Sequence, residues 1–477
     1  MKLRRLFLVF TLALLSLAAV AQSPEAVLES IRKYPNLGIT VGSTYPSVPL
    51  RELVATPEGF EPFYFSLVGR HGSRYEQSDS RFRRAATAFN KADSLGILTT
   101  EGKALRVELN KIWRAQKGHD GELSELGAKQ WHEIGCRAYE RFKPAFEGGS
   151  IEGKSSTSLR CIFSMAAFND AIKGCSPSVR VTQQARKSEL WIVRPHHDNP
   201  SISKEAKRIH KEWDDHGEWN SVRKEWDRSH KAPDFISKVV TDEKRFLKEC
   251  GAKYSGRIAR YAYMTLIFGE NFELGNREML CRLFTPEEIY NFYVYNAARW
   301  VNYALGRGND IIEMKQAHMR SMIEDIINKG NEAIEGKNPH TANVRFTHDS
   351  YVGPLLSAMG YEGCVPQWSA DLEAATTSYN HGVICPMAAN LQIVLYRNKA
   401  GKVLVRSLIN ENDAYLPIKC KTAPFYPWND FCKFMYENLD RFDKAEARVY
   451  IQWRTTCSIS QVKWQMQWDL ASPTCCQ

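Results

Sequence analysis

Short apolar runs that end in glycine or polar residues recur along this chain of 477 residues. The first run covers residues 63–68, breaks at Gly69 and continues as Arg70-His71-Gly72-Ser73-Arg74. A β-prone run that ends in a glycine-flanked turn predicts a strand whose next side chains lie at the carboxyl edge of a sheet. Open α/β sheets bind their ligands at that edge. The sequence therefore predicts a binding site directly after this strand.

Two later segments repeat this arrangement. Residues 150–154 predict a short strand that opens into a serine-rich loop and a helix with Arg160 in its first turns. Residues 343–347 predict another strand, followed by His348-Asp349 and a helix over 351–359. Residues 389–397 and 402–408 predict a β-hairpin around Asn398-Lys399-Ala400-Gly401. These elements indicate an α/β core sheet flanked by helices.

Helical periodicity dominates between these strands. A helix is predicted over 79–95, where Arg81 and Arg84 follow the first strand closely, and another begins after Ser124, a favourable N-cap. From 178 to 339 long helical patterns occur with few strand signals, which predicts a helical cap, with helices over 203–214, 233–250, 286–304 and 312–334. We therefore predict a discontinuous core over 22–177 and 340–477, interrupted by a cap over 178–339.

The first 21 residues have the pattern of a signal peptide. Lys2, Arg4 and Arg5 precede an apolar stretch over 6–20, and Ala19-Val20-Ala21 is a small-x-small cleavage site. No second long apolar run follows, so we expect a secreted or periplasmic protein, cleaved near Ala21 and free of the membrane afterwards. The 12 cysteines are even in number, which in an exported chain predicts disulfides.

The formal net charge of +10 suits an anionic substrate, and we find no motif for nucleic acid. The sequence contains no C-x-x-C. In His196-His197-Asp198, three adjacent side chains point in different directions, which favours a polar loop over a metal site. We therefore expect no metal.

The residue types after the first strand fit phosphate chemistry. Arg70 and Arg74 offer bidentate clamps for phosphate oxygens, and a neutral His71 between them can attack phosphorus. Arg160, close to a helix N-terminus, could supply a third clamp. Taken alone, each of these groups also fits a solvated polar loop.

The motifs taken together resemble the histidine acid phosphatases, the phytase-containing branch of the histidine phosphatase superfamily. The resemblance rests on Arg70-His71-Gly72-x-Arg74, Gly121-x-Leu-Ser-x-x-Gly-x-x-Gln130, Arg160-x-x-x-Ser164, Phe346-Thr-His-Asp349, Pro354-Leu-Leu-x-x-x-Gly360 and Asn410-Glu411, in this order. It implies a phosphoglycerate mutase-like core and a phosphomonoesterase without cofactor. It also implies His71 as nucleophile, Asp349 as proton donor, and Arg70, Arg74, Arg160 and His348 as phosphate ligands.

The resemblance is less complete where substrate specificity is concerned. Glu76 stands where the family pattern has proline, and Tyr75 is similar to the tyrosine of the multiple inositol polyphosphate phosphatases. Those enzymes carry H-A-E at the donor site, whereas this chain has His348-Asp349-Ser350. We expect Tyr75, Arg81 and Arg84 to contact substrate, and inositol polyphosphates such as phytate to be substrates. A broad sugar phosphatase, a mutase and a non-catalytic phosphosugar- or polyanion-binding protein are the alternatives.

Overall fold

The computed structural model describes residues 23–195, 219–251, 254–300, 309–367, 369 and 371–444. The predicted signal peptide, the His196-His197-Asp198 segment and the predicted helix over 203–214 lie outside these residues.

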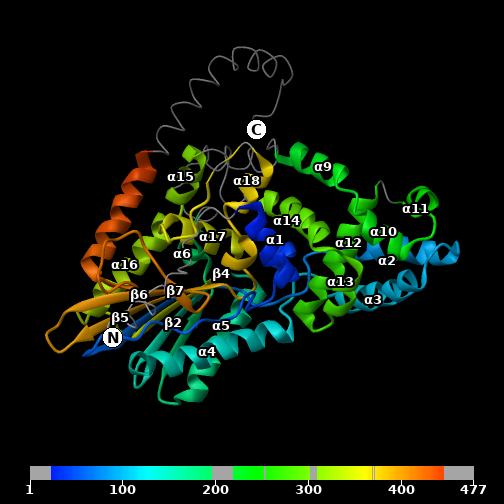
Figure 1. The fold of residues 1–477 in the computed structure, drawn as a ribbon. Coiled ribbons are helices and arrows are strands. Elements are labelled where there is room, and N and C mark those ends of the chain that lie inside the picture. The colour runs from blue at the N-terminus through cyan, green and yellow to red at the C-terminus, as the bar shows by residue number, and fades with distance from the viewer. Residues whose placement is uncertain are drawn as a thin grey trace, which may run out of the picture.

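A central sheet carries the strand ends that the sequence singled out (Figure 1). Its eight strands follow the order β3-β2-β4-β1-β5-β6-β7, and β8 pairs with β6. The strands are β1 (Phe60–Arg70), β2 (Ser150–Ser155), β3 (Arg180–Gln184), β4 (Ala342–Thr347), β5 (Asn390–Asn398), β6 (Val403–Ile409), β7 (Asn412–Ala414) and β8 (Phe425–Pro427). The predicted α/β class and the β5–β6 hairpin are confirmed.

The register of the parallel strands brings the predicted polar residues to one edge. Strands β2, β4 and β1 are neighbours and parallel, and Arg70 at the end of β1 lies opposite Thr347 at the end of β4. The residues that follow all three strands therefore meet at the same carboxyl edge, as the sequence predicted.

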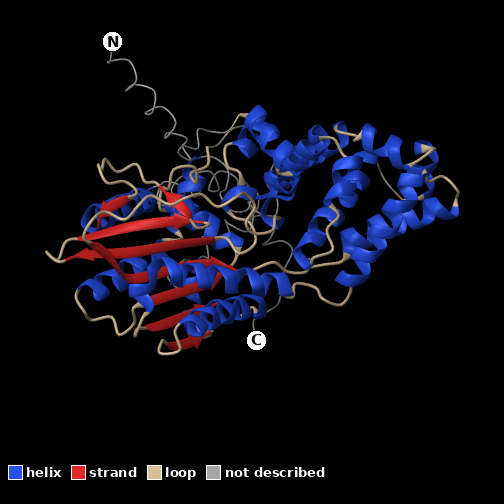
Figure 2. Cartoon of the chain, turned by 60° about the horizontal axis from the view of Figure 1, so that its bottom comes forward, coloured by secondary structure: helices blue, strands red, loops and turns tan. Residues whose placement is uncertain are grey.

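Strand β1 is apolar without alternation because helices cover both of its faces. Phe65 and Leu67 pack in one cluster with residues of α4 (Glu125–Phe146) and α5 (Leu159–Cys175). Tyr64 and Val68 pack in a second cluster on the other face. That cluster holds residues of α15 (Asn309–Ala317), α16 (Arg320–Ile334), α17 (Asp349–Ala358) and a helix over 428–444. Figure 2 shows the sheet between helices and the all-helical part beside it.

The helical part has its own hydrophobic cluster. It is built from α1 (Pro24–Lys33), η1 (Pro35–Gly42), α2 (Ser80–Ser94), α3 (Thr100–Gln116), α10 (Pro233–Val239), α11 (Glu243–Glu249), α12 (Ser255–Phe268), η3 (Gly269–Phe272), α13 (Arg277–Leu283), α14 (Pro286–Trp300) and α18 (Leu372–Thr377). Helix α9 (Trp219–Ser229) packs against α14. The remaining short helices are η2 (Lys187–Glu189), α6 (Leu190–Val193) and α19 (His381–Ile384).

The packing departs from the predicted division of the chain in two places. Helices α2 and α3, assigned to the core, pack in the helical cluster through residues such as Phe89 and Leu109. Helices α15 and α16, assigned to the cap, pack against the sheet through residues such as Met322 and Ile326. Both segments are amphipathic, and an apolar stripe does not specify which partner will cover it.

Some predicted elements differ in detail. The helix predicted over 233–250 is two helices, because Asp242 starts α11 by accepting a hydrogen bond from the backbone N–H of Arg245. The helix predicted over 312–334 is likewise divided, into α15 and α16. Strand β3 was not predicted because it is a polar, exposed strand at the end of the sheet.

The expected disulfides are not present in the described part of the chain, where nine cysteines are free thiols. Several of them, such as Cys161, Cys364 and Cys385, are buried in the core as small apolar groups. Cys136 and Cys175 do interact. Burial raises the pKa of Cys136, and the neighbouring Cys175 thiol raises it further.

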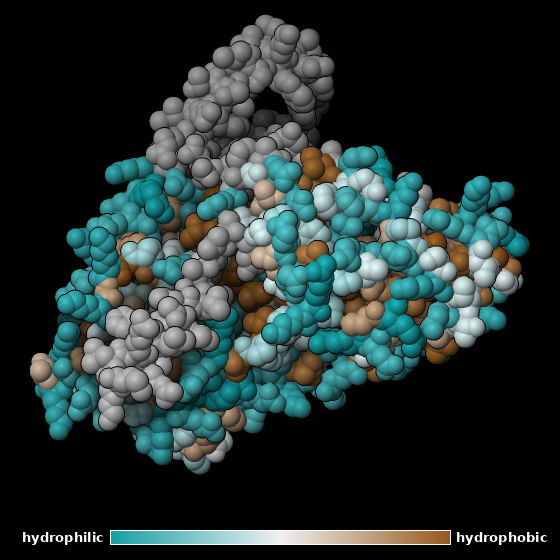
Figure 3. Space-filling view, viewed as in Figure 1, coloured by the Kyte–Doolittle hydropathy of each residue, from teal (hydrophilic) through white to brown (hydrophobic). Residues whose placement is uncertain are grey.

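The face of the molecule in Figure 3 is mainly hydrophilic, with hydrophobic residues scattered among the polar ones. Within the described residues, no helix combines the length and apolarity needed to cross a bilayer.

Candidate active site

The loop after β1 is fixed by backbone contacts on all sides. The His71 N–H donates to the Thr347 carbonyl of β4, and the His71 carbonyl accepts from Ala388 N–H, so sheet pairing continues through His71. Helix α4 touches the loop directly. A Cβ at Gly72 would lie 2.3 Å from the Gly127 carbonyl oxygen, and one at Gly127 would lie 2.0 Å from the Ser73 carbonyl oxygen. Both positions therefore require glycine.

Side chains of α4 and α5 also hold this loop in place. The Ser73 N–H donates to Gln130 Oε1 (2.9 Å), and the Gly72 N–H donates to Ser164 Oγ (2.9 Å). The indole N–H of Trp131 donates to the Arg70 carbonyl (2.9 Å). Ser164 and Gln130 thus explain why two downstream motifs accompany the Arg-His-Gly segment: both hold the loop in place.

His71 is held in one tautomer. Its Nδ1 lies 2.9 Å from the Gly72 carbonyl, which can only accept, so Nδ1 carries the proton and Nε2 keeps its lone pair. Burial, followed by the charges of Arg70, Arg74 and Arg160, holds the pKa of His71 well below its usual value. This shift favours the neutral imidazole, which is the nucleophilic form.

Arg70 connects the strand ends of β1 and β4. Its buried guanidinium donates to the carbonyls of Val41 (2.5 Å) and Cys385 (2.9 Å), and Nη2 lies 3.1 Å from Asp349 Oδ2. Asp349 starts α17 and accepts from the Ser350 N–H. Burial raises the pKa of Asp349, but the charges around it, that of Arg70 first, together with the Ser350 N–H, outweigh burial, so the net shift is downward.

His348 is surrounded by groups from the segment after β2. Arg160 Nη2 lies 3.4 Å from His348 Nδ1, and the hydroxyls of Ser156 and Ser158 lie 3.3 and 3.4 Å from Nε2. The His348 and His71 rings stand edge-on with centroids 5.6 Å apart. Burial and the Arg160 charge lower the pKa of His348 to about 3, so it is a neutral hydrogen-bonding group.

A cavity of about 770 Å³ opens over these residues. The predicted residues Arg70, His71, Arg74, Arg160, His348 and Asp349 line it, and so do Arg81 and Arg84 of α2. Tyr75 does not: its ring is stacked between His119 and Phe272, with centroids 4.8 Å from each. Its expected contact with substrate is therefore not supported, because aromatic packing turns the ring away from the cavity.

The opposite wall contains residues that the sequence did not identify. They are Arg223 of α9, Arg260 of α12 and Tyr295 of α14. Arg194, which also lines the cavity and was not identified from the sequence, lies on the sheet side close to His348. The Arg260 guanidinium lies 3.7 Å from the Tyr295 ring centroid and forms a bidentate pair with the buried Asp227. Arg223 lies 4.8 Å from the same centroid. The sequence carries no signal for them, since arginines on amphipathic helices usually face solvent.

Among the described residues, no group of three His, Cys, Asp or Glu side chains is arranged to hold a metal ion. The cavity instead presents two uncharged histidine side chains, His71 and His348, together with several guanidinium groups and the carboxyl groups of Asp349 and Glu76. Such a set can bind a phosphoryl group, accept it and protonate a leaving oxygen.

Comparison with known proteins identifies this class. The model of the histidine phosphatase superfamily, branch 2, matches residues 65–410. The chain therefore belongs to this family, and it is a phosphomonoesterase of the histidine acid phosphatase and phytase-like type. A related protein is the thiamine-repressible acid phosphatase pho4 of Schizosaccharomyces pombe, 20% identical over 392 residues, which are 77% of this chain and 78% of the relative.

Solved structures share the fold. The multiple inositol polyphosphate phosphatase of Bifidobacterium longum, in complex with inositol hexasulfate, superposes with a TM-score of 0.64 at 18% identity and covers 82% of this chain and 96% of its own. The phytase from D. castellii superposes with a TM-score of 0.61 at 16% identity, covering 86% of each chain.

Proposed function

We propose that this protein hydrolyses phosphomonoesters through a phosphohistidine on His71, with Asp349 as proton donor. The observation that carries the proposal is the position of the His71 imidazole. It is buried, fixed by its Nδ1 contact to Gly72, and surrounded by Arg70, Arg74 and Arg160. A phosphomonoester dianion repels nucleophiles, and positioned guanidinium groups offset that repulsion.

The reaction would proceed in two steps. His71 Nε2 attacks phosphorus in line while the bond to the ester oxygen breaks, and Asp349 protonates that oxygen. Water then attacks the phosphohistidine, with Asp349 as base, and releases inorganic phosphate. Arg70 pairs with Asp349 and favours its ionised form, so the bound phosphate dianion must raise the pKa of this carboxyl group again for it to act as an acid.

The decisive experiment is replacement of His71 by alanine. No release of inorganic phosphate from p-nitrophenyl phosphate is expected, because the variant lacks the imidazole that accepts the phosphoryl group in the proposed reaction. The matched control is His132→Ala, which removes an exposed histidine of α4. Wild-type turnover by His71→Ala would contradict the covalent mechanism, and an inactive wild-type protein would favour a non-catalytic polyanion-binding role.

The role of Asp349 is tested by the leaving group. Asp349→Asn should lower kcat by about 10²-fold on an alkyl phosphate and far less on p-nitrophenyl phosphate, whose phenolate needs little protonation. Equal losses on both esters would assign Asp349 another role.

Inositol polyphosphates are the substrate class we propose. The cavity is lined by the guanidinium groups of both walls, including Arg81, Arg84, Arg223 and Arg260, more than one phosphate requires. The Bifidobacterium longum enzyme, solved with inositol hexasulfate, shares the fold. A panel of phosphate esters tests this: kcat/KM should be highest for inositol hexakisphosphate, whereas equal values for sugar monophosphates would indicate a broad phosphatase.

We further propose that the protein is exported, on the strength of the basic and apolar pattern over residues 1–21. Mass spectrometry of the protein from its native host should give an N-terminus at Gln22. An intact Met1 in a cytoplasmic fraction would contradict export.

A further inference from the structure

One carboxylate in the cavity takes no part in the proposed reaction. Among the described residues that line the cavity, Glu76 and Asp349 are the acidic ones, against eight arginines. Asp349 is the proposed proton donor, which leaves Glu76. It occupies the position where the sequence departs from the family pattern, and an anion beside an anion-binding site works against substrate binding unless it has another role.

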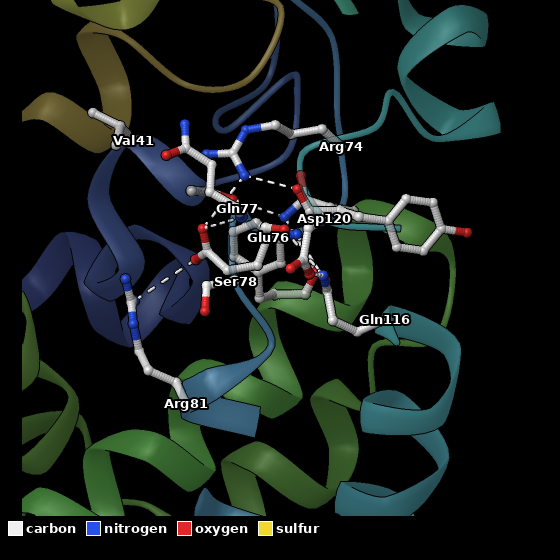
Figure 4. A network of polar contacts seen from close by, with 12 residues as sticks. Val41, Arg74, Glu76, Gln77, Ser78, Arg81, Gln116 and Asp120 are labelled. Atoms are coloured by element: carbon white, nitrogen blue, oxygen red, sulfur yellow. Dashed lines mark hydrogen bonds and ion pairs between the residues drawn. The ribbon is translucent and has the colours of Figure 1, made fainter. Parts of the chain in front are cut away.

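The Glu76 carboxylate bridges two arginines (Figure 4). Oε1 lies 3.4 Å from Arg74 Nη1 and accepts from the Gln77 N–H at 2.9 Å. Oε2 lies 3.7 Å from Arg81 Nη1. The Glu76 side chain is only 12% exposed, whereas that of Arg81 is 31% exposed. One end of the carboxylate therefore faces a phosphate ligand of the site, and the other faces an arginine nearer to solvent.

The backbone of Glu76 is equally constrained. Its N–H donates to Gln116 Oε1 (2.7 Å), and its carbonyl accepts from Gln116 Nε2 (3.0 Å) and from the Gly121 N–H (2.9 Å). Gln116 is fully buried at the end of α3. Proline has no N–H to donate, so it could not form the first of these bonds. The carboxylate is thus held at a fixed place in the cavity.

Glu76 is ionised in this position. Burial raises the pKa of its carboxyl group, but the charges of Arg81 and Arg74 more than offset this, and the net shift is downward. The negative charge consequently persists in a mildly acidic medium.

We propose that Glu76 is a positioning and specificity-determining residue. Its carboxylate orients the Arg74 guanidinium toward the scissile phosphate and neutralises Arg81, which lowers the affinity of the adjacent subsite for a second phosphate group. The protein consequently binds densely phosphorylated substrates less tightly than its arginines alone would allow, and it releases their polyanionic products more easily. This inference rests on the proposed phosphatase function.

The test uses Glu76→Gln, which keeps the shape and an acceptor for the Gln77 N–H and removes only the charge. Calorimetric titration with inositol hexasulfate and with inorganic phosphate measures binding of a polyanion and of a single anion without turnover. The ratio of the two dissociation constants, hexasulfate over phosphate, should fall by about fivefold, as expected for one partly exposed ion pair. The kcat on p-nitrophenyl phosphate should fall by less than about tenfold, because Arg74 loses its ionic contact with Glu76 but keeps the 2.7 Å hydrogen bond from Nη1 to the Tyr75 carbonyl.

Matched variants separate this role from a general effect of charge or folding. Glu122→Gln removes the same charge from an exposed residue of the neighbouring segment and should leave the ratio unchanged. Glu76→Asp retains the charge and should restore part of the wild-type ratio. In Glu76→Gln/Arg81→Gln the gain in hexasulfate affinity should disappear, since Arg81 provides it.

The proposal is overturned if Glu76→Gln changes both dissociation constants by the same factor, or if the double variant keeps the tighter hexasulfate binding. Because binding is measured without turnover, these outcomes stay separate from failure of the proposed function, which would appear as an inactive wild-type protein. Thermal unfolding of each variant identifies loss of fold. If Glu76→Gln is unfolded, Glu76→Asp replaces it: its shorter side chain moves the carboxylate away from Arg81, so the ratio of dissociation constants should be lower than in Glu122→Asp. Equal ratios in these two variants would overturn the proposal.

Discussion

The two walls of the cavity hold their side chains in place by different contacts. We call them the sheet wall, formed at the strand ends, and the helical wall, formed by α9, α12 and α14. On the sheet side, His71 and Arg70 extend from strand ends whose backbone is paired with both neighbouring strands. On the helical side, Arg223 and Arg260 project from separate helices and are positioned by side-chain contacts with Tyr295 and Asp227. Backbone pairing fixes the first set, and side-chain packing fixes the second.

This difference indicates how the fold divides its tasks. In-line attack tolerates little misplacement, so the reacting groups lie where sheet hydrogen bonds restrict the backbone. Recognition of a polyanion depends on the number and placement of charges and allows more variation, so those charges can lie on helices. The sheet wall should therefore decide whether any ester reacts, and the helical wall should decide which.

The largest expected effect comes from removing a charge from the sheet wall, to which we assign Arg160 because it lies in the first turn of α5, directly after β2. Arg160→Met should lower kcat by about 10²- to 10³-fold on p-nitrophenyl phosphate and on inositol hexakisphosphate alike, because the lost guanidinium stabilises the transferring phosphoryl group itself. Steady-state phosphate release measures this. Arg180→Met, which changes an exposed arginine of β3, is the control. A loss confined to one of the two esters would mean that Arg160 serves recognition instead.

The counterpart on the helical wall is Arg223→Gln. Its effect should depend on the substrate, with kcat/KM on inositol hexakisphosphate reduced by about tenfold and the reduction on p-nitrophenyl phosphate clearly smaller. Raising the salt concentration should narrow the gap, since part of the attraction is screened. If both esters lost activity equally, the division between the walls would be wrong.

A smaller effect concerns the pH dependence of stability, through a buried histidine outside both walls. His381, 2% exposed, packs edge-on against Tyr379, and burial lowers its pKa from 6.5 to about 3. The unfolded chain binds the proton first as the pH falls, so the stability that this residue contributes is present above about pH 6.5 and is lost toward pH 3. His381→Phe should reduce the slope of unfolding free energy against pH by about 1 kcal/mol per pH unit between pH 4 and 6.

Chemical denaturation at several pH values measures that slope. His132→Phe, at an exposed position on α4, serves as the reference. An unchanged slope in His381→Phe would mean that the folded protein binds a proton at His381 as readily as the unfolded chain does, so that burial does not lower its pKa.

The sheet wall could be predicted from the sequence because strand, turn and reactive residue follow one another along the chain. The segment from Phe63 to Arg74 contains the strand, the turn and the reactive residues, and the same order recurs where His348-Asp349 follows β4. The helical wall could not be predicted, because Arg223 and Arg260 meet only through the packing of α9, α12 and α14. The expected contact of Tyr75 with substrate rested on a resemblance at this position, which carries no information about the stacking of the Tyr75 ring on Phe272.

The close contact between Gly72 and Gly127 affects how the protein can vary. Each lies on a different segment, and a methyl group on either would collide with the backbone of the other segment, at 2.3 Å and 2.0 Å. No single substitution at either position can be accommodated without separating α4 from the reactive loop. In a saturation mutagenesis experiment these two residues should tolerate as few replacements as His71, although neither has a functional group. Intolerance to mutation would therefore locate this site correctly. It would not distinguish residues that react, such as His71, from residues that only hold the loop in place, such as the two glycines.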